Sequence, residues 1–476
     1  MSRLTVAPHN PTVAIIGGGF TGATVAAHLA SGPALPPGTR IIVVEPRAAL
    51  GQGLAYGATD PAHRINVPAG KMTMDPERPQ DFEDYLQATG AAAHDADLIG
   101  RDGLPYPQRA VFGAYMAARL APLLAAGQVE HWQTRVRALK ALASGYRIDG
   151  EDGRALTADL VVLAVSHPAP ALPRGFEALR GAPKLIADVT LPDALAPIET
   201  EDRVLILGNG LTSADAIASL ARQGHRGPLL SLSRRGLRSR AHGPAGQAAY
   251  GAFADGPRTS ASTLLRDIRQ TIRQAEREGL TWHAVIDAVR AQGQTIWPGL
   301  PMAERRRIVR HLRPFWDVHR FRIAPQVDDV LRRATDAGRL QLLAASVASV
   351  DHQDGVYRLQ VRDRRSKTLR QVEADAVIVT TGPAHGGILE SQPFLADLAR
   401  EGLLQPCPTG LGIACDQDGH PLAGNGRPVE EVFIAGPLAR GTVGELMGLP
   451  QVTDHAVFIA AQLRARLLKH RESSAA

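Results

Sequence analysis

Short runs of apolar, mostly β-branched residues alternate along the chain with longer stretches of helical periodicity. The first runs, Val13–Ile16 and Arg40–Val44, are typical of parallel strands that are buried on both faces of a sheet. A helical stretch, Thr21–Ser31, separates them. Farther along, Val204–Leu207 is a third run of this type, and a helical stretch at Thr212–Arg222 follows it. This alternation predicts an α/β fold with parallel sheets.

The remaining pattern suggests one dinucleotide-binding domain inserted into another. The sequence Val129–Arg147 alternates as an antiparallel hairpin does, Leu160–Val165 is another buried strand, and residues 259–312 are helical with a break at Pro298–Pro301. Later strands are expected at Leu340–Val350, Tyr357–Val361, Ala376–Val379 and Val432–Gly436, before a long helix at Val452–Lys469. The predicted fold is therefore two Rossmann-like domains with a helical insertion. The boundaries are 1–170 and 323–476 for the first domain, 200–256 for the second, and 257–322 for an insertion that covers the active site.

Two glycine patterns stand between a strand and a helix. The first is G-x-G-x-x-G at Gly17, Gly19 and Gly22, and the second is G-x-G-x-x-S at Gly208, Gly210 and Ser213. In this motif the glycines allow a tight turn, a close backbone approach to a pyrophosphate, and close packing of a helix whose N-terminus faces the phosphates. One such motif is a weak signal, but two of them predict two dinucleotide sites.

The residues that follow the second strand of each unit differ between the two sites. Glu45, 28 residues after Gly17, stands where a carboxylate accepts hydrogen bonds from a ribose diol. Arg234 and Arg235 occupy the corresponding place in the second unit, where arginine accommodates a 2′-phosphate. We therefore expect FAD at the first site and a nicotinamide dinucleotide, NADPH rather than NADH, at the second. A solvated strand end is the alternative interpretation of the two arginines.

Composition limits the function further. The net charge of +6 suits an anionic substrate, but there is no basic stripe with interleaved aromatic residues, so nucleic-acid binding is not expected. Two cysteines form neither a disulfide framework nor a redox pair, which favours a reducing cytoplasm. No apolar stretch is long enough to span a membrane, and no metal site is expected. The oligomeric state cannot be read from the sequence.

Several blocks resemble one flavoprotein family. GGGFTGATVAAHL, GQGLAYG, INVPAGKM, GNGLTSADAIASLARQGHRGPLLSLSRRG, WDVHRFRIAP and FIAGPLARGTVGEL are similar to FAD/NAD(P)-binding proteins that include an FAD-dependent urate hydroxylase and an FAD-dependent L-aspartate N-monooxygenase. The blocks extend from Thr12 to about Ala456. The resemblance implies bound FAD, reduction by NAD(P)H, and O₂ addition to give a flavin C4a-hydroperoxide that hydroxylates a small molecule. The F-x-G-x-x-x-H signature of classical flavin monooxygenases is absent, which favours N- or C-hydroxylation over sulfide oxidation.

Three functions remain open at this point. The first is a monooxygenase of a small anionic nitrogen-containing metabolite, with urate to 5-hydroxyisourate as the first substrate and an amino acid of the L-aspartate type as the alternative. The second is an FAD/NAD(P)H oxidoreductase that does not hydroxylate, and the third is a flavin-binding sensor. Urate hydroxylases of this kind are expected to accept NADH, which conflicts with the NADPH preference that Arg234 and Arg235 indicate.

Candidate site residues follow from the motifs and the resemblance together. The residues expected to contact a dinucleotide are Gly17, Gly19, Phe20, Thr21, Gly22, Glu45, Pro46, Arg47, Gly53, Asn66, Met72, Gly208, Gly210, Leu211, Thr212, Ser213, Ser233, Arg234, Arg235, Gly436, Gly441 and Thr442. Asn66, His319 and Arg320 are the candidate catalytic residues, because an amide can face the flavin and a guanidinium can bind an anion in two-point geometry. An Asn that bonds its own turn, and Arg and His on a solvated helix, are the alternatives.

Overall fold

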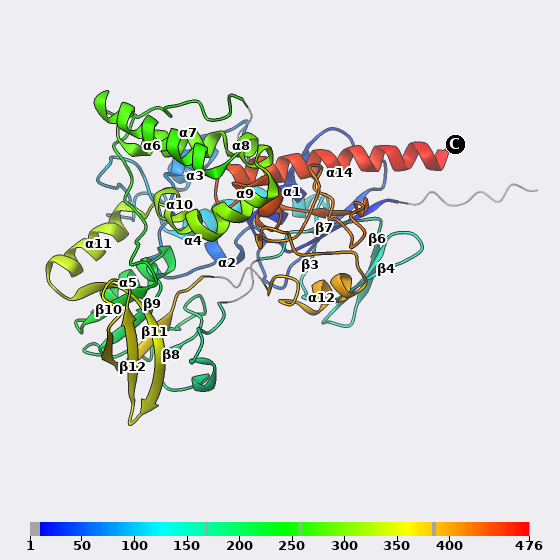
Figure 1. The fold of residues 1–476 in the computed structure, drawn as a ribbon. Helices are drawn as coiled ribbons and strands as arrows, with labels where there is room; N and C mark the ends of the chain where they lie inside the picture. The colour runs from blue at the N-terminus through cyan, green and yellow to red at the C-terminus, as the bar shows by residue number, and fades with distance from the viewer. Residues whose placement is uncertain (1–9, 167–169, 257–258, 383–386, 476) are drawn as a thin grey trace, which may run out of the picture.

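The computed structural model describes residues 10–166, 170–256, 259–382 and 387–475, and two parallel sheets organise them (Figure 1). The first sheet has the strand order β15-β7-β1-β2-β3. Its strands are β1 (Thr12–Ile16), β2 (Arg40–Val44), β3 (Glu130–Trp132), β7 (Leu160–Leu163) and β15 (Val432–Ile434). All neighbouring strands are parallel, and β1 is buried along its whole length because its apolar residues face layers on both sides.

The second sheet has the order β13-β12-β11-β10-β9-β14-β8. Its strands are β8 (Leu185–Ile186), β9 (Val204–Leu207), β10 (Leu229–Ser233), β11 (Leu340–Gln353), β12 (Val356–Asp363), β13 (Leu369–Ala374) and β14 (Ala376–Val379). Strands β8, β9, β10, β11 and β14 pair in parallel, whereas β11, β12 and β13 form an antiparallel ribbon at one edge.

This topology corrects the predicted domain boundaries. The strands from Leu340 to Val379 were expected to return to the first domain, within 323–476. Instead, β11 pairs with β10, and β14 pairs with β9. The prediction was wrong here because a buried apolar strand has the same sequence pattern in either parallel sheet, and only its pairing partners distinguish the two. The second domain therefore extends well beyond residue 256, on both sides of the helical insertion.

The helical insertion agrees with the sequence pattern. It contains α6 (Ala261–Arg277), α7 (Trp282–Ala291), α8 (Gly293–Gly299), α9 (Met302–Arg307), the π-helical turn η3 (Ile308–Leu312) and α10 (Arg313–Arg320). Ser260 caps α6 by accepting a hydrogen bond from the Thr263 N–H. Figure 1 shows these helices in green, above the second sheet and beside the first domain.

The other helices cover the two sheets. They are α1 (Phe20–Ser31), α2 (Gly53–Tyr56), α3 (Asp81–Thr89), α4 (Arg109–Ala125), α5 (Leu211–Arg222), α11 (Pro325–Asp336), α12 (Pro393–Arg400), α13 (Arg440–Val443) and α14 (Gln451–Ala475), with short 3₁₀ turns η1 (Ala69–Lys71), η2 (Glu177–Leu179) and η5 (Gly436–Ala439). Helix α14, red in Figure 1, packs along α1. A small antiparallel sheet consists of β4 (Val136–Ala141), β5 (Tyr146–Gly150) and β6 (Ala155–Ala158). It confirms the hairpin predicted within Val129–Arg147 from Val136 onward, whereas the start of that segment is β3 of the first, parallel sheet. Within the described residues, no helix is both long and apolar enough to cross a membrane.

Candidate functional site

The first glycine motif forms a tightly closed turn between β1 and α1. Gly17 has φ +101°, and its N–H donates to the carbonyl of Val44 at 2.9 Å. A Cβ at Gly17 would lie 2.6 Å from the carbonyl oxygen of Ala164, and one at Gly22 would lie 1.9 Å from the carbonyl oxygen of Gly17. Both positions therefore require glycine, which is the packing that the dinucleotide motif predicts.

A second backbone segment lies against this turn. Gly53 has φ +54°, and a Cβ on it would lie 3.1 Å from the Cα of Gly19. The N–H of Gly51 donates to the carbonyl of Gly18 at 2.8 Å. Two glycine-rich segments in contact at the N-terminus of α1 leave a surface of bare backbone, and this surface suits the close approach of a pyrophosphate. The residues predicted at Gly19 and Gly53 are thus brought together.

Glu45 lies at the carboxyl end of β2, as predicted, and is only 4% exposed. Its Oε2 accepts a hydrogen bond from the Gly18 N–H at 2.9 Å, and its Oε1 accepts from the backbone N–H and the guanidinium of Arg47. The carboxylate therefore reaches across the glycine turn. A carboxylate has more acceptor positions than these three donors occupy, so Glu45 can still bind a ribose diol.

The second motif is more open. Gly208 has φ +126°, and a Cβ on it would clash with the carbonyl of Thr380, but a Cβ on Gly210 would meet nothing within 4 Å. Ser213 replaces the third glycine, and its hydroxyl donates to the carbonyl of Gly210 at 2.7 Å. The positions predicted at Leu211 and Thr212 begin helix α5, so their N–H groups stand at its positive end. The turn can hold a pyrophosphate and is less enclosed than the first.

The residues after β10 separate into different environments. The hydroxyl of Ser233 accepts from the N–H of Gly236 at 3.0 Å, and Arg234 is exposed. The guanidinium of Arg235 lies 5.2 Å from the ring centroid of Phe315, on the helical insertion. The predicted pair of arginines is therefore split, because Arg235 stacks on an aromatic ring while Arg234 remains accessible.

Asn66 connects the first domain to the segment after the insertion. Its Oδ1 accepts from the N–H of Ala324 at 3.0 Å, and its carbonyl accepts from Nε2 of His242. A backbone N–H donor fixes the orientation of the amide, so the two N–H groups of Asn66 face away from Ala324. Burial and the nearby Arg322 lower the pKa of His242 to about 4, so its ring is neutral near pH 7. The contact with Ala324 thus orients the Asn66 amide, and its role at the flavin stays a prediction.

The other predicted cofactor residues have mixed environments. Gly436, at φ +68°, lies so close to Thr21 that a Cβ would be 2.6 Å from its hydroxyl, which places the end of β15 beside the first glycine turn. Phe20 and Met72 point into the hydrophobic core, and the carbonyl of Pro46 accepts from Gln133. At Gly441 a Cβ would meet the sulfur of Cys407, and the hydroxyl of Thr442 donates to the carbonyl of Cys415. The side chains of Phe20 and Met72 are thus occupied by core packing, and that of Thr442 by its hydrogen bond to Cys415. At Gly441 the neighbouring Cys407 leaves no room for a side chain.

Arg320 belongs to a buried group of charges between the insertion and the segment after β15. It is 6% exposed, and its Nε donates to Glu445 at 2.7 Å. Trp316 donates to the other oxygen of the same carboxylate at 3.2 Å. His319 does not join this group: its Nδ1 donates to the carbonyl of Phe315, and its ring meets the edge of Trp282. The two candidate catalytic residues of α10 therefore face different neighbours.

Two further arginines complete this group, and sequence analysis missed both. Arg290 donates to Gln451 at 2.6 Å, and burial, followed by the charge of Arg320, lowers its pKa to about 9. Arg440 is 5% exposed, and its nearest carboxylate is Asp317 at 3.7 Å. Burial lowers the pKa of Arg440 and raises that of Asp317. The sequence signal that could have found Arg440 is its position four residues after Gly436, on the loop that the resemblance assigns to the flavin.

We call this group the arginine cluster. It consists of Arg290, Arg313, Arg320, Arg322 and Arg440 together with Asp287, Asp317 and Glu445. Five guanidinium groups against three carboxylates leave a formal charge of +2. The buried donors Nη2 of Arg320, Nη1 of Arg440 and Nε of Arg322 have no hydrogen-bond partner among the described residues, and one acceptor, Oδ1 of Asp317, also has none there. Such buried unpaired donors are costly, and an anion would satisfy them.

Ion pairs hold the two domains together near the site. Arg109, at the start of α4, pairs with Asp215 of α5 at 2.8 Å, and Arg222 pairs with Asp60 at 3.0 Å. The ring of His63 also hydrogen-bonds to Ser219 at 3.1 Å. These contacts run from Asp215 near the start of α5 to Arg222 at its end, so they fix one face of the helix to the first domain.

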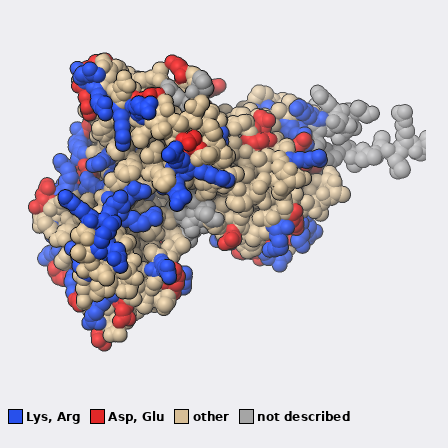
Figure 2. Space-filling model, in the orientation of Figure 1, with Lys and Arg blue, Asp and Glu red and all other residues tan. Residues whose placement is uncertain are grey.

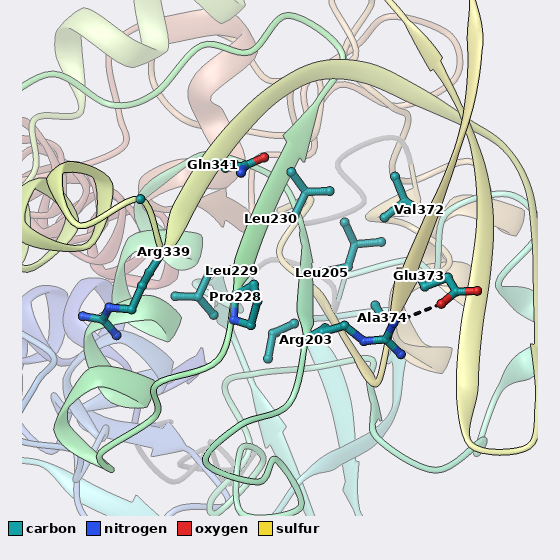
Figure 3. Close-up of a pocket in the computed structure, with 12 residues that line it drawn as sticks. Arg203, Leu205, Pro228, Leu229, Leu230, Arg339, Gln341, Val372, Glu373 and Ala374 are labelled. Carbon is teal, nitrogen blue, oxygen red and sulfur yellow. Dashed lines mark hydrogen bonds and ion pairs between the residues drawn. The ribbon is translucent and has the colours of Figure 1, made fainter.

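A separate cavity of about 160 Å³ lies elsewhere on the second sheet (Figure 3). It is lined by residues at the beginnings of β9, β10 and β11, and Arg203 pairs there with Glu373 at 3.0 Å. Ligands of open α/β sheets bind at the carboxyl ends of the strands, which is the opposite edge. This cavity is therefore not part of the dinucleotide site. Among the described residues, no group of His, Cys, Asp and Glu could hold a metal ion.

Comparisons with known proteins agree with this description. Residues 14–168 match a family model, NAD_binding_9, described as FAD-NAD(P)-binding. No curated protein sequence matches the chain. The family match confirms the predicted resemblance to FAD/NAD(P)-binding proteins for the part of the chain that holds the first glycine motif and Glu45.

Solved structures match nearly the whole chain. Ornithine hydroxylase PvdA from Pseudomonas aeruginosa has a TM-score of 0.67 at 16% identity, covering 96% of this chain and 100% of its own. The ornithine N-hydroxylase KtzI of Kutzneria sp. 744, with reduced FAD, NADP⁺ and L-ornithine, has a TM-score of 0.61 at 17% identity, with 96% and 100% covered. The FAD-bound cadaverine monooxygenase DfoA from Erwinia amylovora has a TM-score of 0.64 at 12% identity, with 97% and 95% covered. The predicted fold class is confirmed: this chain has the fold shared by these hydroxylases, and its residues 14–168 are similar to FAD-NAD(P)-binding proteins.

Proposed function

We propose that the protein is an FAD-dependent, NADPH-consuming monooxygenase that hydroxylates the amino group of an acidic amino acid of the L-aspartate type. In this reaction the amine, O₂, NADPH and a proton give the N-hydroxylamine, NADP⁺ and water. One oxygen atom forms the new N–O bond, and the other leaves as water with the two electrons of NADPH. The observation that carries the proposal is the arginine cluster, with its excess of buried positive charge.

The residues around the first glycine motif fit FAD. Gly19 and Gly53 leave bare backbone at the N-terminus of α1, Glu45 offers acceptors for a ribose, and Gly436 brings the loop after β15 to the same turn. When bound, the flavin supplies hydride acceptance and the activation of O₂. The second motif, with Gly210 open and Arg234 accessible, fits NADPH.

The arginine cluster selects the substrate by charge. The nitrogen of an amine must be neutral to react with an electrophilic oxygen, so the reacting form of an acidic amino acid carries two negative charges. The cluster has a formal charge of +2, and buried donors of Arg320 and Arg440 are without partners. A dianion would neutralise the cluster and pair these donors, whereas a cationic side chain would add to the positive charge of Arg320, which together with burial, the larger cause, lowers the pKa of Arg290.

The similar structures help to choose between the substrate classes. Their names describe hydroxylation of ornithine and cadaverine, so the shared fold supports an amine substrate better than urate. The arginine cluster distinguishes this chain from an enzyme for a basic side chain, because a second positive charge would be buried beside Arg320 and Arg440. Urate, a planar anion, remains the outcome to test against.

We infer that two tryptophans of the insertion limit the access of water to the cluster. Trp316 donates to Glu445, and Trp297 donates to the carbonyl of Gly441 at 2.9 Å. Both come from the insertion and bind the segment after β15, so they connect the two sides of the site. Exclusion of water strengthens the charge interactions and protects reactive oxygen species from decay. Asn66 supplies an oriented amide donor at the junction of the first domain with this cover.

The test measures coenzyme oxidation and product together. FAD-loaded protein is given NADPH with L-aspartate, L-ornithine or urate, and hydroxylamine formation and urate absorbance are followed. We expect stoichiometric NADPH oxidation and N-hydroxy product with the acidic amino acid alone. Arg440→Gln should raise the KM for this substrate at least about tenfold, because a buried charge-assisted contact is lost, while the affinity for NADP⁺ stays the same. Arg306→Gln, which removes the charge of an exposed arginine on α9 of the insertion, is the control.

Three results would contradict parts of the proposal. If urate and NADPH are consumed in equal amounts, the substrate is urate and not an acidic amino acid. Hydroxylation of ornithine alone would show that the cluster does not select the substrate. If NADPH is oxidised rapidly and none of the compounds is hydroxylated, the protein is a flavin oxidoreductase and not a monooxygenase.

A further inference from the structure

The β11–β12–β13 ribbon of the second sheet places a turn rich in Arg and Lys beside the carboxyl end of β10, where the coenzyme is proposed to bind. Ser233, the last residue of β10, pairs with Ala344 of β11, and the next residue of β11, Ala345, pairs with Asp363 at the end of β12. The turn that follows β12, at residues 364–368, therefore lies beside the residues after β10. These are the residues at which a 2′-phosphate would bind in a Rossmann-like domain.

Two hydrogen bonds hold Arg364 beside the carboxyl end of β10. Its backbone N–H donates to the carbonyl of Ala344 at 2.8 Å, and its Nη1 donates to the carbonyl of Arg234 at 3.3 Å. Asp363 fixes the turn, since its carboxylate accepts from the N–H groups of Arg365 and Ser366, each at 2.8 Å. These N–H groups also hold the pKa of the Asp363 carboxyl below its usual value. The carboxylate is thus occupied within the turn.

The guanidinium groups of Arg234 and Arg364 are both exposed, and within the described part of the chain neither has a carboxylate partner. Arg235 is different, because its guanidinium lies over the ring of Phe315. Figure 2 shows Lys and Arg side chains gathered on the face between α10 and the β11–β12 ribbon. Arg234 and Arg364 are therefore accessible cations from two different elements that are in direct contact at this edge.

We propose that Arg364 acts with Arg234 to bind the 2′-phosphate of NADPH and sets the preference for NADPH over NADH; this inference rests on the proposed function. A 2′-phosphate carries about −1.5 to −2 charges near pH 7 and accepts hydrogen bonds through three oxygens. Guanidinium groups donate through a planar fork that matches these oxygens. Arg235 holds the insertion against the end of β10 and does not contact the phosphate.

The experiment measures binding directly, without turnover. Titration calorimetry with FAD-loaded protein compares NADP⁺, NAD⁺ and 2′,5′-ADP as ligands. We expect Arg364→Ala to weaken NADP⁺ and 2′,5′-ADP about tenfold and to leave NAD⁺ within about twofold, as for the loss of one charge-assisted contact. Arg364→Lys should recover part of this loss, since it keeps the charge without the fork.

Arg365→Ala is the matched control. It removes the same charge from the next position of the turn, where only the backbone N–H has a hydrogen bond among the described residues. We expect it to change NADP⁺ binding by less than about twofold at 0.15 M salt, where charges that make no contact are screened. FAD content and the unfolding temperature of all three variants are measured to confirm that they fold.

The inference is overturned if Arg364→Ala leaves NADP⁺ binding unchanged, weakens NAD⁺ equally, or has no larger effect than Arg365→Ala. The proposed function fails in a different way. If the wild-type protein binds neither NADP⁺ nor NAD⁺, it has no nicotinamide coenzyme. If it binds both equally, the monooxygenase proposal stands with either coenzyme, and only the role of Arg364 is lost.

Discussion

The two glycine motifs of this chain have nearly the same spacing, but their surroundings differ. The first is closed: a Cβ at Gly22 has no room, Gly53 contacts Gly19, and Glu45 is buried across the turn. The second is open: a Cβ at Gly210 would meet nothing, and a serine replaces the third glycine. The two motifs therefore share a local turn geometry, but many neighbouring contacts support the first turn and few support the second.

This difference suggests different exchange rates for the two nucleotides. A pre-organised site that buries its ligand loses less entropy on binding and releases it slowly. An exposed site with accessible cations allows entry and release in each cycle. We expect the first nucleotide to be retained during purification and the second to exchange. The four predictions below test this contrast.

The largest effect is expected for Gly22→Ala. The added methyl would lie 1.9 Å from a backbone oxygen, and a backbone atom cannot move aside as a flexible side chain can. The variant should be purified without FAD, with affinity reduced more than about 100-fold, which is about 2.7 kcal/mol. The flavin-to-protein absorbance ratio measures this loss.

Gly210→Ala is the matched change in the second motif. Gly210 has φ −85°, which alanine adopts freely, and its Cβ would point into open space. The variant should keep full FAD content while NADP⁺ binding weakens about tenfold, because the methyl occupies the approach of the pyrophosphate. Loss of FAD from this variant, or its retention in Gly22→Ala, would remove the contrast.

Acid is expected to have the next largest effect, through His455. This histidine is 5% exposed, and its Nδ1 accepts from the N–H of Gly436 at 3.1 Å. Burial lowers its pKa from 6.5 to about 4. Between pH 6.5 and pH 4 this histidine binds more protons in the unfolded chain than in the folded protein. Its contribution to the free energy of unfolding is therefore complete above pH 6.5 and decreases as the pH falls toward 4. At pH 5 the loss is about 2 kcal/mol from this group.

Urea unfolding at pH 7 and pH 5 measures this loss, and flavin fluorescence reports the release of FAD. His455→Gln can still accept a hydrogen bond but does not titrate, so its loss between the two pH values should be smaller by about 2 kcal/mol. His242 shares the direction of the shift, and comparison with the variant isolates His455. An equal loss in both proteins would show that His455 is not the responsible group.

Glu45→Gln should have the smallest effect. Glutamine keeps the shape and one acceptor, but the contact with the Gly18 N–H loses its charge. We expect FAD to bind about fivefold to tenfold more weakly, while NADP⁺ affinity is unchanged. Titration of the apoprotein with FAD gives the first value, and calorimetry gives the second. A larger effect on NADP⁺ than on FAD would show that the two sites are exchanged.

Most of the fold could be predicted from local pattern. The strands at Val13 and Val204, the helices after each glycine motif, and the break near Pro298 depend on residues close in sequence. The pairing of Ala376–Val379 could not be predicted, because a strand that is apolar on both faces carries no information about its sheet. The helices of the insertion were recognised from their periodicity.

The site was predictable to the extent that backbone motifs define it. The glycines and Glu45 occupy positions that a fixed geometry requires. The grouping of Arg290 with Arg440 could not be predicted, because the two residues come from separate elements and are brought together only by packing. The one sequence signal was the position of Arg440 on the loop after Gly436. Arg235 lies at the expected position, but its guanidinium lies over Phe315, and position in the sequence alone does not indicate that contact. Local sequence identifies turns, whereas a side-chain cluster depends on the complete topology.

The pairing of β15 with β7 has a consequence for biosynthesis. The first sheet is complete only when Val432–Ile434 is available, and Thr453 of α14 donates to the carbonyl of Thr73 across the molecule. All strands of the second sheet lie between Leu185 and Val379. Domains generally fold as units while the chain emerges from the ribosome. The second domain can therefore fold first. The N-terminal residues complete the FAD site only after the last part of the chain, with β15, has been synthesised.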